Sequence, residues 1–148
     1  MALYYLETSA LVKLYVREAG TDRMLALAAR SSDNRLTILS LAQVEFRSAI
    51  RRRERNGEIP AFVASQLLDA FGRHLESRFV TQTINDFLLD IASTLVDRHA
   101  LRAFDAVQLA GYIVLRSNAG IDTPVFVCSD DELLASAQLE GAPTLDPR

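Results

Sequence analysis

Four acidic side chains occupy similar places along this chain and have the chemistry to bind a divalent metal ion. Glu7 ends a short apolar run, and Asp130 follows another apolar run almost directly. Glu45 and Asp105 lie within segments of helical spacing, each among apolar neighbours. A lone carboxylate is costly to bury in such surroundings. Clustered carboxylates also repel one another, and a bound cation would relieve both costs.

The carboxylate ligand set indicates which metal and which reaction to expect. Oxygen ligands alone suit Mg²⁺, or Mn²⁺ in its place, whereas zinc prefers nitrogen and sulfur. An acidic site that holds one or two such ions can polarise a phosphate group, generate hydroxide from water and stabilise the leaving oxygen. We therefore expect cleavage of a phosphodiester bond, with the number of ions left open.

Each acid also has a purely structural explanation. Glu45 could pair with Arg52 or Arg53 on a solvated helix face. Asp105 could be an acid at a helix N-terminus, where the helix dipole favours it, and Asp130 could cap the last helix. For any one acid alone the structural explanation is preferred. The four acids together, in this order along the chain, favour the metal site.

The elements that would position the acids can be read from hydrophobic spacing. Apolar or alternating runs predict strands at 2–6, 36–39, 78–83 and 124–128. Helical spacing predicts helices at 9–18, 22–30, 41–55, 60–74, 85–99, 103–116 and 130–139. Strands that alternate with helices imply a single α/β domain over residues 1–148, with a parallel sheet of about four to five strands and helices on both faces. Acids that follow parallel strands then meet at one edge of the sheet.

Two local details accompany these elements. Thr8 or Ser9 can cap the first helix, because both are hydroxyl residues directly before its apolar positions. One side of the helix predicted at 85–99 is expected to carry Ile84, Phe87, Leu88, Ile91, Leu95 and Val96.

Composition limits the classes of protein that the chain can belong to. A 49% share of hydrophobic residues is ordinary for a globular domain, and the net charge of −3 gives no overall electrostatic case for nucleic acid. The single cysteine, Cys128, cannot form an internal disulfide, which fits a reducing compartment. No apolar run approaches the ~20 residues of a membrane span, and no charged-then-apolar leader precedes the first strand. We therefore expect a cytoplasmic protein without a membrane partner.

Four motifs, taken in order, resemble the PIN-domain family and, more narrowly, the VapC-type toxin ribonucleases. They cover residues 5–13 (YLETSALVK), 44–46 (VEF), 104–110 (FDAVQLA) and 126–130 (FVCSD). The resemblance extends over essentially the whole chain. It implies a PIN-like three-layer fold and a metal-dependent endoribonuclease that acts on RNA, forms a homodimer and is neutralised by a cognate antitoxin protein.

The resemblance also assigns roles to individual residues. The four metal-site acids of the family correspond to Glu7, Glu45, Asp105 and Asp130. A hydroxyl residue after the first acid often helps to position metal-bound water, and Thr8 and Ser9 occupy that place. Asp131 is a rival to Asp130 for the fourth acid, since both lie at the end of a strand.

The first acid departs from the family pattern, because Glu7 stands where Asp is usual. Its extra methylene extends the carboxylate by ~1.5 Å, well beyond the tolerance of about ±0.2 Å in a well-formed metal site. This departure keeps a second hypothesis open, a catalytically attenuated PIN module that binds antitoxin or RNA. A third hypothesis is a nuclease for DNA or structured RNA rather than a toxin, which the short chain without an added substrate-binding domain argues against.

Arginines form a stripe on the helix that carries Glu45. The stripe contains Arg47, Arg51 and Arg55, at i, i+4 and i+8. Arg52 lies seven residues after Glu45 and so shares its face. Arg51, Arg52 and Arg55 could bind RNA phosphates beside the acids, or they could form a solvated face with partners such as Glu54.

Overall fold

Five short parallel strands form the centre of the structure, a computed structural model that describes residues 2–148. The strands are β1 (Leu3–Leu6), β2 (Arg35–Leu39), β3 (Phe79–Gln82), β4 (Val125–Val127) and β5 (Thr144–Leu145), and their order across the sheet is β3-β2-β1-β4-β5. Every neighbouring pair is parallel. This confirms the predicted parallel sheet and adds β5, which the sequence did not indicate.

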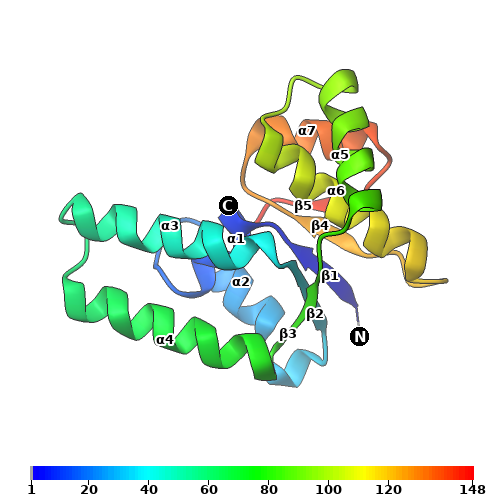
Figure 1. The fold of residues 1–148 in the computed structure, drawn as a ribbon. Coiled ribbons are helices and arrows are strands. Elements are labelled where there is room, and N and C mark those ends of the chain that lie inside the picture. Colours follow the sequence, from blue (N-terminus) through cyan, green and yellow to red (C-terminus); the bar gives the residue numbers. More distant parts are fainter. Residues whose placement is uncertain (1) are drawn as a thin grey trace.

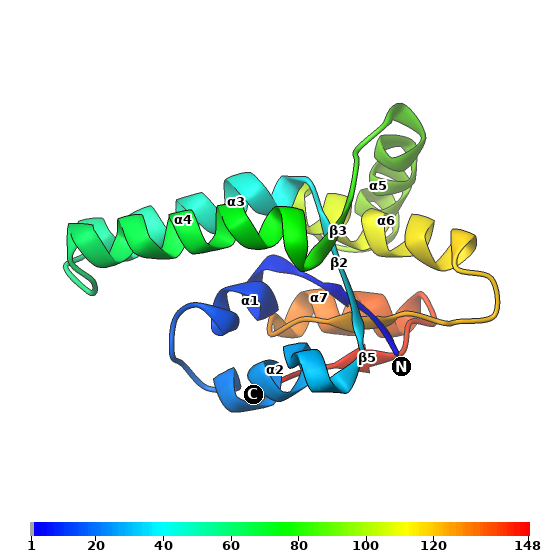
Figure 2. The ribbon, with the colours of Figure 1, turned by 90° about the horizontal axis from the view of Figure 1, so that it is seen from below.

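Helices cover both faces of this sheet, as predicted for a three-layer α/β fold (Figure 1). They are α1 (Thr8–Leu11), α2 (Thr21–Ala28), α3 (Leu41–Arg55), α4 (Ala61–Ser77), α5 (Asp86–Arg98), α6 (Ala103–Asn118) and α7 (Asp131–Leu139). Two short 3₁₀ turns, η1 (Val12–Leu14) and η2 (Arg30–Ser32), follow α1 and α2. Figures 1 and 2 show α3 and α4 as a pair of packed helices that projects beyond the sheet. Within residues 2–148, no helix has both the length and the apolar character needed to cross a membrane.

The two faces of the sheet support separate halves of the core, because side chains alternate along each strand. Tyr5 of β1 and Phe126 of β4 are neighbours in register and stack with ring centroids 5.7 Å apart, in the half that α5, α6 and α7 cover. Leu6 and Val127, the next pair along, face the half that α1 to α4 cover. Pairing with β2 and β4 and packing on both faces hold β1 in the middle of the sheet, which fixes the position of Glu7, the next residue.

The first helix is shorter than predicted. The spacing predicted a helix to residue 18, but α1 ends at Leu11 and only a 3₁₀ turn continues to Leu14. The predicted cap was also wrong, because Glu7 is the N-cap residue and its side chain accepts a hydrogen bond from the backbone N–H of Ser9. Beyond the turn, Glu18 forms an ion pair with Lys13, with 3.0 Å between Oε1 of Glu18 and Nζ of Lys13.

The packed side of α5 also differs from the prediction. Phe87 and Val96 remain 63% and 44% exposed, whereas Leu88, Ala92 and Leu95 are buried against α6. The buried stripe follows the i, i+4, i+7 pattern of an amphipathic helix that starts from Leu88. The sequence therefore predicted the helix correctly but wrongly included Phe87 and Val96 in its packed side.

Candidate metal centre

The four predicted acids all lie on the side of the molecule where the strands end. Glu7 is the first residue after β1, and Asp130 is the N-cap residue of α7, three residues after β4. Glu45 lies in the second turn of α3, which follows β2, and Asp105 lies in the first turn of α6. Because the strands are parallel, their carboxyl ends share one edge, the edge at which open α/β sheets bind ligands.

Glu7 is turned back toward its own helix. Its side chain is buried, and Oε2 accepts hydrogen bonds from the backbone N–H of Ser9 at 2.8 Å and from the Ser9 hydroxyl. The pKa of the Glu7 carboxyl is raised to about 7, mainly by burial and to a smaller extent by the charge of Glu45, against the lowering effect of the Ser9 hydrogen bonds. Glu7 thus caps α1, and its carboxylate is held by Ser9.

Glu45 is held by a buried polar network rather than by an arginine. Its Oε1 accepts hydrogen bonds from the Thr8 hydroxyl at 2.9 Å and from Nε2 of Gln108 at 2.7 Å. Oε1 of Gln108 in turn accepts a hydrogen bond from the Tyr5 hydroxyl at 2.9 Å. The same amide nitrogen also donates to Thr8 at 3.2 Å. The network ties β1, α1, α3 and α6 together at the acidic edge.

Gln108 and Tyr5 are the members of this site that sequence reasoning missed. The sequence shows Gln108 and Tyr5 only as parts of the motifs at 104–110 and 5–13, with no role assigned to either. One signal could have found Gln108: it lies three residues after Asp105, on the same side of the helix. An amide at such a position, fully buried as Gln108 is, must find partners, and the acid network supplies them.

Asp105 and Asp130 are electrostatically coupled. Asp105 is half-buried, and burial raises its pKa, followed by the negative charges of Asp130 and Glu45. Asp130 is exposed and caps α7, with Oδ1 accepting from the backbone N–H of Leu133 at 2.9 Å. Asp130 therefore caps α7, as the structural explanation predicted. Its charge also raises the pKa of Asp105, so its role as a cap does not exclude a role as a metal ligand.

Asp131, the rival for the fourth position, has a different environment. It is exposed and forms an ion pair with the guanidinium of Arg148 near the C-terminus. Its charge is therefore balanced within the chain, whereas none of the other four acids forms an ion pair within residues 2–148.

The four carboxylates have the chemistry to bind a hard cation, but they do not lie close enough together to share one. Four carboxylates with uncompensated charge are the oxygen ligands that Mg²⁺ and Mn²⁺ prefer. In the described conformation, however, residues 2–148 contain no group of three acid, histidine or cysteine side chains near enough together to hold one ion. Glu7 accounts for part of this gap, because its carboxylate is engaged by Ser9. Binding of an ion would require the carboxylates to turn toward one another.

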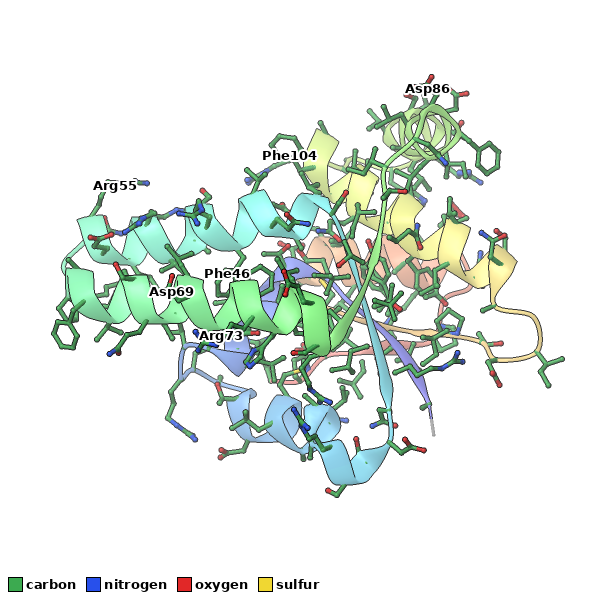
Figure 3. The ribbon with its side chains drawn as sticks, turned by 60° about the horizontal axis from the view of Figure 1, so that its bottom comes forward. Phe46, Arg55, Asp69, Arg73, Asp86 and Phe104 are labelled. Carbon is green, nitrogen blue, oxygen red and sulfur yellow. The ribbon has the colours of Figure 1, made fainter. Side chains whose placement is uncertain are left out.

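A cavity of about 430 Å³ adjoins two of these acids, Glu7 and Glu45. Its lining includes Glu7, Thr8, Ser9, Glu45, Arg52 and Phe104. Of the three candidate RNA-binding arginines, only Arg52 lines it. Arg51 pairs with Glu54 at 2.8 Å, as the solvated-face explanation expects, and Arg55 lies at the far end of α3 (Figure 3).

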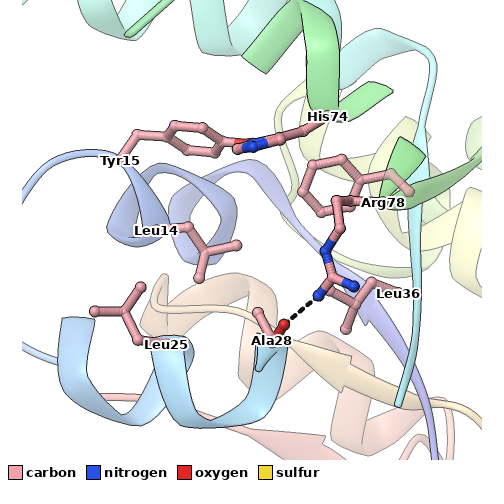
Figure 4. Close-up of a pocket in the computed structure, with 8 residues that line it drawn as sticks. Leu14, Tyr15, Leu25, Ala28, Leu36, His74 and Arg78 are labelled. Atoms are coloured by element: carbon pink, nitrogen blue, oxygen red, sulfur yellow. Dashed lines mark hydrogen bonds between the residues drawn. The ribbon is translucent and has the colours of Figure 1, made fainter. Parts of the chain in front are cut away.

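Another cavity, of about 160 Å³, is largely apolar and contains no acid (Figure 4). There the Tyr15 hydroxyl lies 2.7 Å from Nδ1 of His74, and Arg78 donates to the backbone carbonyl of Ala28. Burial lowers the pKa of His74. These contacts give His74 a structural place in this cavity.

The buried carboxyl of Glu7 predicts a dependence of stability on pH. Its pKa is raised from 4.5 to about 7 in the folded chain, so the unfolded chain releases this proton first. Folding stability is then greatest below about pH 4.5 and falls as the pH rises toward 7. For metal-free protein in EDTA, we expect urea unfolding to show a loss on the order of 2–3 kcal/mol from this group. Glu7→Gln cannot ionise and should flatten the profile, and an equally steep profile would assign the effect to another group.

Comparison with solved structures places this geometry among known folds. PAE2754 from Pyrobaculum aerophilum superposes with a TM-score of 0.61 at 25% sequence identity, over 97% of this chain and 89% of that chain. VapBC2 from Rickettsia felis, solved bound to a DNA fragment from their promoter, superposes with a TM-score of 0.62 at 14% identity, over 97% of both chains. FitAcB from Neisseria gonorrhoeae gives 0.56 at 12% identity, over 99% of this chain and 98% of that chain.

Sequence comparison alone does not make this connection, because neither a protein-family model nor a curated protein sequence matches the chain. The similarity lies in the fold, whose centre in this chain is a parallel five-stranded sheet covered by helices. In fold, this chain is therefore similar to these three solved proteins, as the resemblance to the PIN-domain family predicted.

Proposed function

We propose that this chain is the toxin of a type II toxin–antitoxin pair and hydrolyses phosphodiester bonds of RNA with Mg²⁺, or with Mn²⁺ in its place. One observation carries the proposal: the pKa of Asp105 is raised by burial, Asp130 and Glu45, and no cationic side chain within residues 2–148 pairs with any of the three. Uncompensated carboxylates at the edge of a parallel sheet favour a divalent cation. The similarity to VapBC2 and FitAcB supports the assignment to a toxin–antitoxin pair.

Each residue of the centre has a separate task in this proposal. Glu45, Asp105 and Asp130 would hold the ion directly or through water, and Glu7 would join them only by leaving Ser9. A bound Mg²⁺ ion polarises the scissile phosphate and makes water a nucleophile at neutral pH. Thr8 and Gln108 fix Oε1 of Glu45 by donating to it, which leaves the other oxygen of that carboxylate for the ion. Asp131, the first residue of α7, would stay in its ion pair with Arg148 beside the centre.

The cleavage assay is the direct test. Purified chain incubated with single-stranded RNA and Mg²⁺ should produce fragments, lose this activity in EDTA and regain it when Mg²⁺ is restored in excess. A neighbouring gene for a small antitoxin should abolish the growth defect caused by expression of the chain in the cytoplasm. Light scattering should give the mass of a homodimer. Absence of cleavage by both the natural chain and the Glu7→Asp variant would contradict the proposed reaction.

A second function, the attenuated PIN module that binds antitoxin or RNA, is favoured by one observation. Ser9 engages the Glu7 carboxylate through both its N–H and its hydroxyl, so the first acid of the metal site is already occupied. Calorimetric titration with Mg²⁺ separates the two functions, because a clear binding isotherm at neutral pH argues against a disabled centre.

Glu7→Asp is expected to raise both Mg²⁺ affinity and RNA cleavage by at least about tenfold. The shorter side chain shifts the carboxylate by ~1.5 Å, and changes around a metal site alter affinity or activity by about 10–100-fold. Asp remains a good N-cap, so α1 should persist and the change should act on the centre. Glu76→Asp, at an exposed position of α4, is the matched control. Equal affinity and rate in Glu7→Asp and the natural chain would show that Glu7 already serves the site as it stands.

A further inference from the structure

The wall of the acidic cavity carries two large apolar side chains that face solvent. Phe104 is 63% exposed and Val44 is 68% exposed, and both line the cavity that Glu7 and Glu45 also line. Phe104 projects from the first turn of α6, immediately before Asp105 (Figure 3). An exposed aromatic ring that lines a cavity beside two carboxylates offers a flat apolar face to a ligand. A single exposed apolar residue is ordinary, but this ring shares its cavity with an arginine.

That arginine is Arg52, which lies on α3. It is exposed and lines the same cavity as Phe104. Within residues 2–148 its guanidinium forms no ion pair, whereas the adjacent Arg51 and Arg53 are paired with Glu54 and Glu18. An unpaired guanidinium in the cavity that Glu7 and Glu45 also line remains available for an anion, and its planar fork suits a phosphate.

We propose that Phe104 and Arg52 form a binding site for single-stranded RNA, in which an unpaired base stacks on the Phe104 ring and a phosphate binds the Arg52 guanidinium. This inference rests on the proposed function, whose substrate class it narrows. A flat aromatic ring can stack only on a base whose face is free, and bases within a duplex cover one another. Because Phe104 directly precedes Asp105, a nucleotide stacked there is delivered to the acidic centre.

Binding without cleavage tests the stacking half of the site. Fluorescence anisotropy of a labelled single-stranded RNA is measured in EDTA, where metal-dependent cleavage cannot occur. Phe104→Ala is expected to weaken binding by about 5- to 150-fold, the range found when a base-stacking aromatic is removed. Phe104→Tyr keeps a flat ring and should bind close to the natural chain. Phe87→Ala is the matched control, because Phe87 is also 63% exposed but does not line the cavity.

Salt dependence tests the arginine half of the site. Arg52→Gln removes one cation, so the slope of log affinity against log salt should become shallower by about 0.7, the value for one phosphate contact on a single strand. Arg47→Gln is the matched control, because Arg47 lies on the same helix, is exposed, and lines a different cavity against α4. A blunt-ended duplex of the same RNA should bind the natural chain more weakly than the single strand does.

The outcomes separate this inference from the proposed function. If Phe104→Ala binds single-stranded RNA as tightly as the natural chain, the stacking site is wrong, even where RNA is cleaved in Mg²⁺. If Phe104→Ala weakens binding as expected but no variant cleaves RNA, the binding site stands and the proposed reaction fails. No measurable affinity of the natural chain for single-stranded RNA, or equal affinity for the duplex, overturns the inference. Circular dichroism of each variant should match the natural chain, since the substituted side chains are exposed.

Discussion

Asp105→Asn is expected to lower Mg²⁺-dependent RNA cleavage by at least about 100-fold, because an active-site metal ion contributes several kcal/mol to transition-state stabilisation. The substitution keeps the shape of the side chain and removes its charge. Asp105 is the acid whose pKa is raised by burial and by two other acids of the centre, Asp130 and Glu45, so the negative charge that attracts a cation is concentrated around it. Calorimetry should show a matching loss of Mg²⁺ affinity.

Stability distinguishes this loss from misfolding. Asp105 repels Asp130 and Glu45 in the metal-free chain, so Asp105→Asn should leave the free energy of unfolding in EDTA unchanged or slightly raised. Asp69→Asn is the control, because Asp69 is exposed on α4 away from the centre and its loss should change neither cleavage nor metal binding (Figure 3). If Asp105→Asn cleaves RNA and binds Mg²⁺ as the natural chain does, the acids are structural.

The central strands were predictable because burial on both sides leaves a continuous apolar run. Such runs predicted β1 and β4, whose residues lie between the two halves of the core. The strand β5 has only two residues, Thr144 and Leu145, and is defined by hydrogen bonds to β4 rather than by a pattern of its own. The end of α1 was missed for a similar reason, because the contact between Lys13 and Glu18 beyond it joins residues that no helical spacing relates.

The sequence could predict where the candidate acids lie but not how their side chains are oriented. The positions of Glu7 and Asp130 follow from strand ends, which a sequence pattern can locate. The direction of the Glu7 carboxylate depends on the Ser9 hydroxyl, and the partners of Glu45 come from α1 and from α6. Such side-chain networks join residues on separate elements, so no local pattern reports them. The conflict between Glu7 as ligand and Glu7 as cap could only emerge from the folded chain.

Gln108→Leu is expected to destabilise the fold by about 3–5 kcal/mol and to lower its Tm by roughly 10 °C. Gln108 is fully buried and bridges Tyr5, Thr8 and Glu45 through three hydrogen bonds of 2.9, 3.2 and 2.7 Å. Leucine has similar bulk and no polar atom, so the Tyr5 hydroxyl loses its acceptor inside the core. Glu45 loses a donor to its charge. Urea and thermal unfolding measure the loss, with Gln66→Leu on the exposed side of α4 as the control.

A double-mutant cycle with Tyr5→Phe shows whether the network acts as one unit. Tyr5→Phe alone leaves the amide oxygen of Gln108 without its donor, and Gln108→Leu alone leaves the Tyr5 hydroxyl without its acceptor. Removing both polar partners together costs less than the sum of the two single changes, since no orphaned group remains between them. Additive losses would mean that water satisfies each group separately. In that case the hydrogen bond between Tyr5 and Gln108 would contribute little to the stability of the fold.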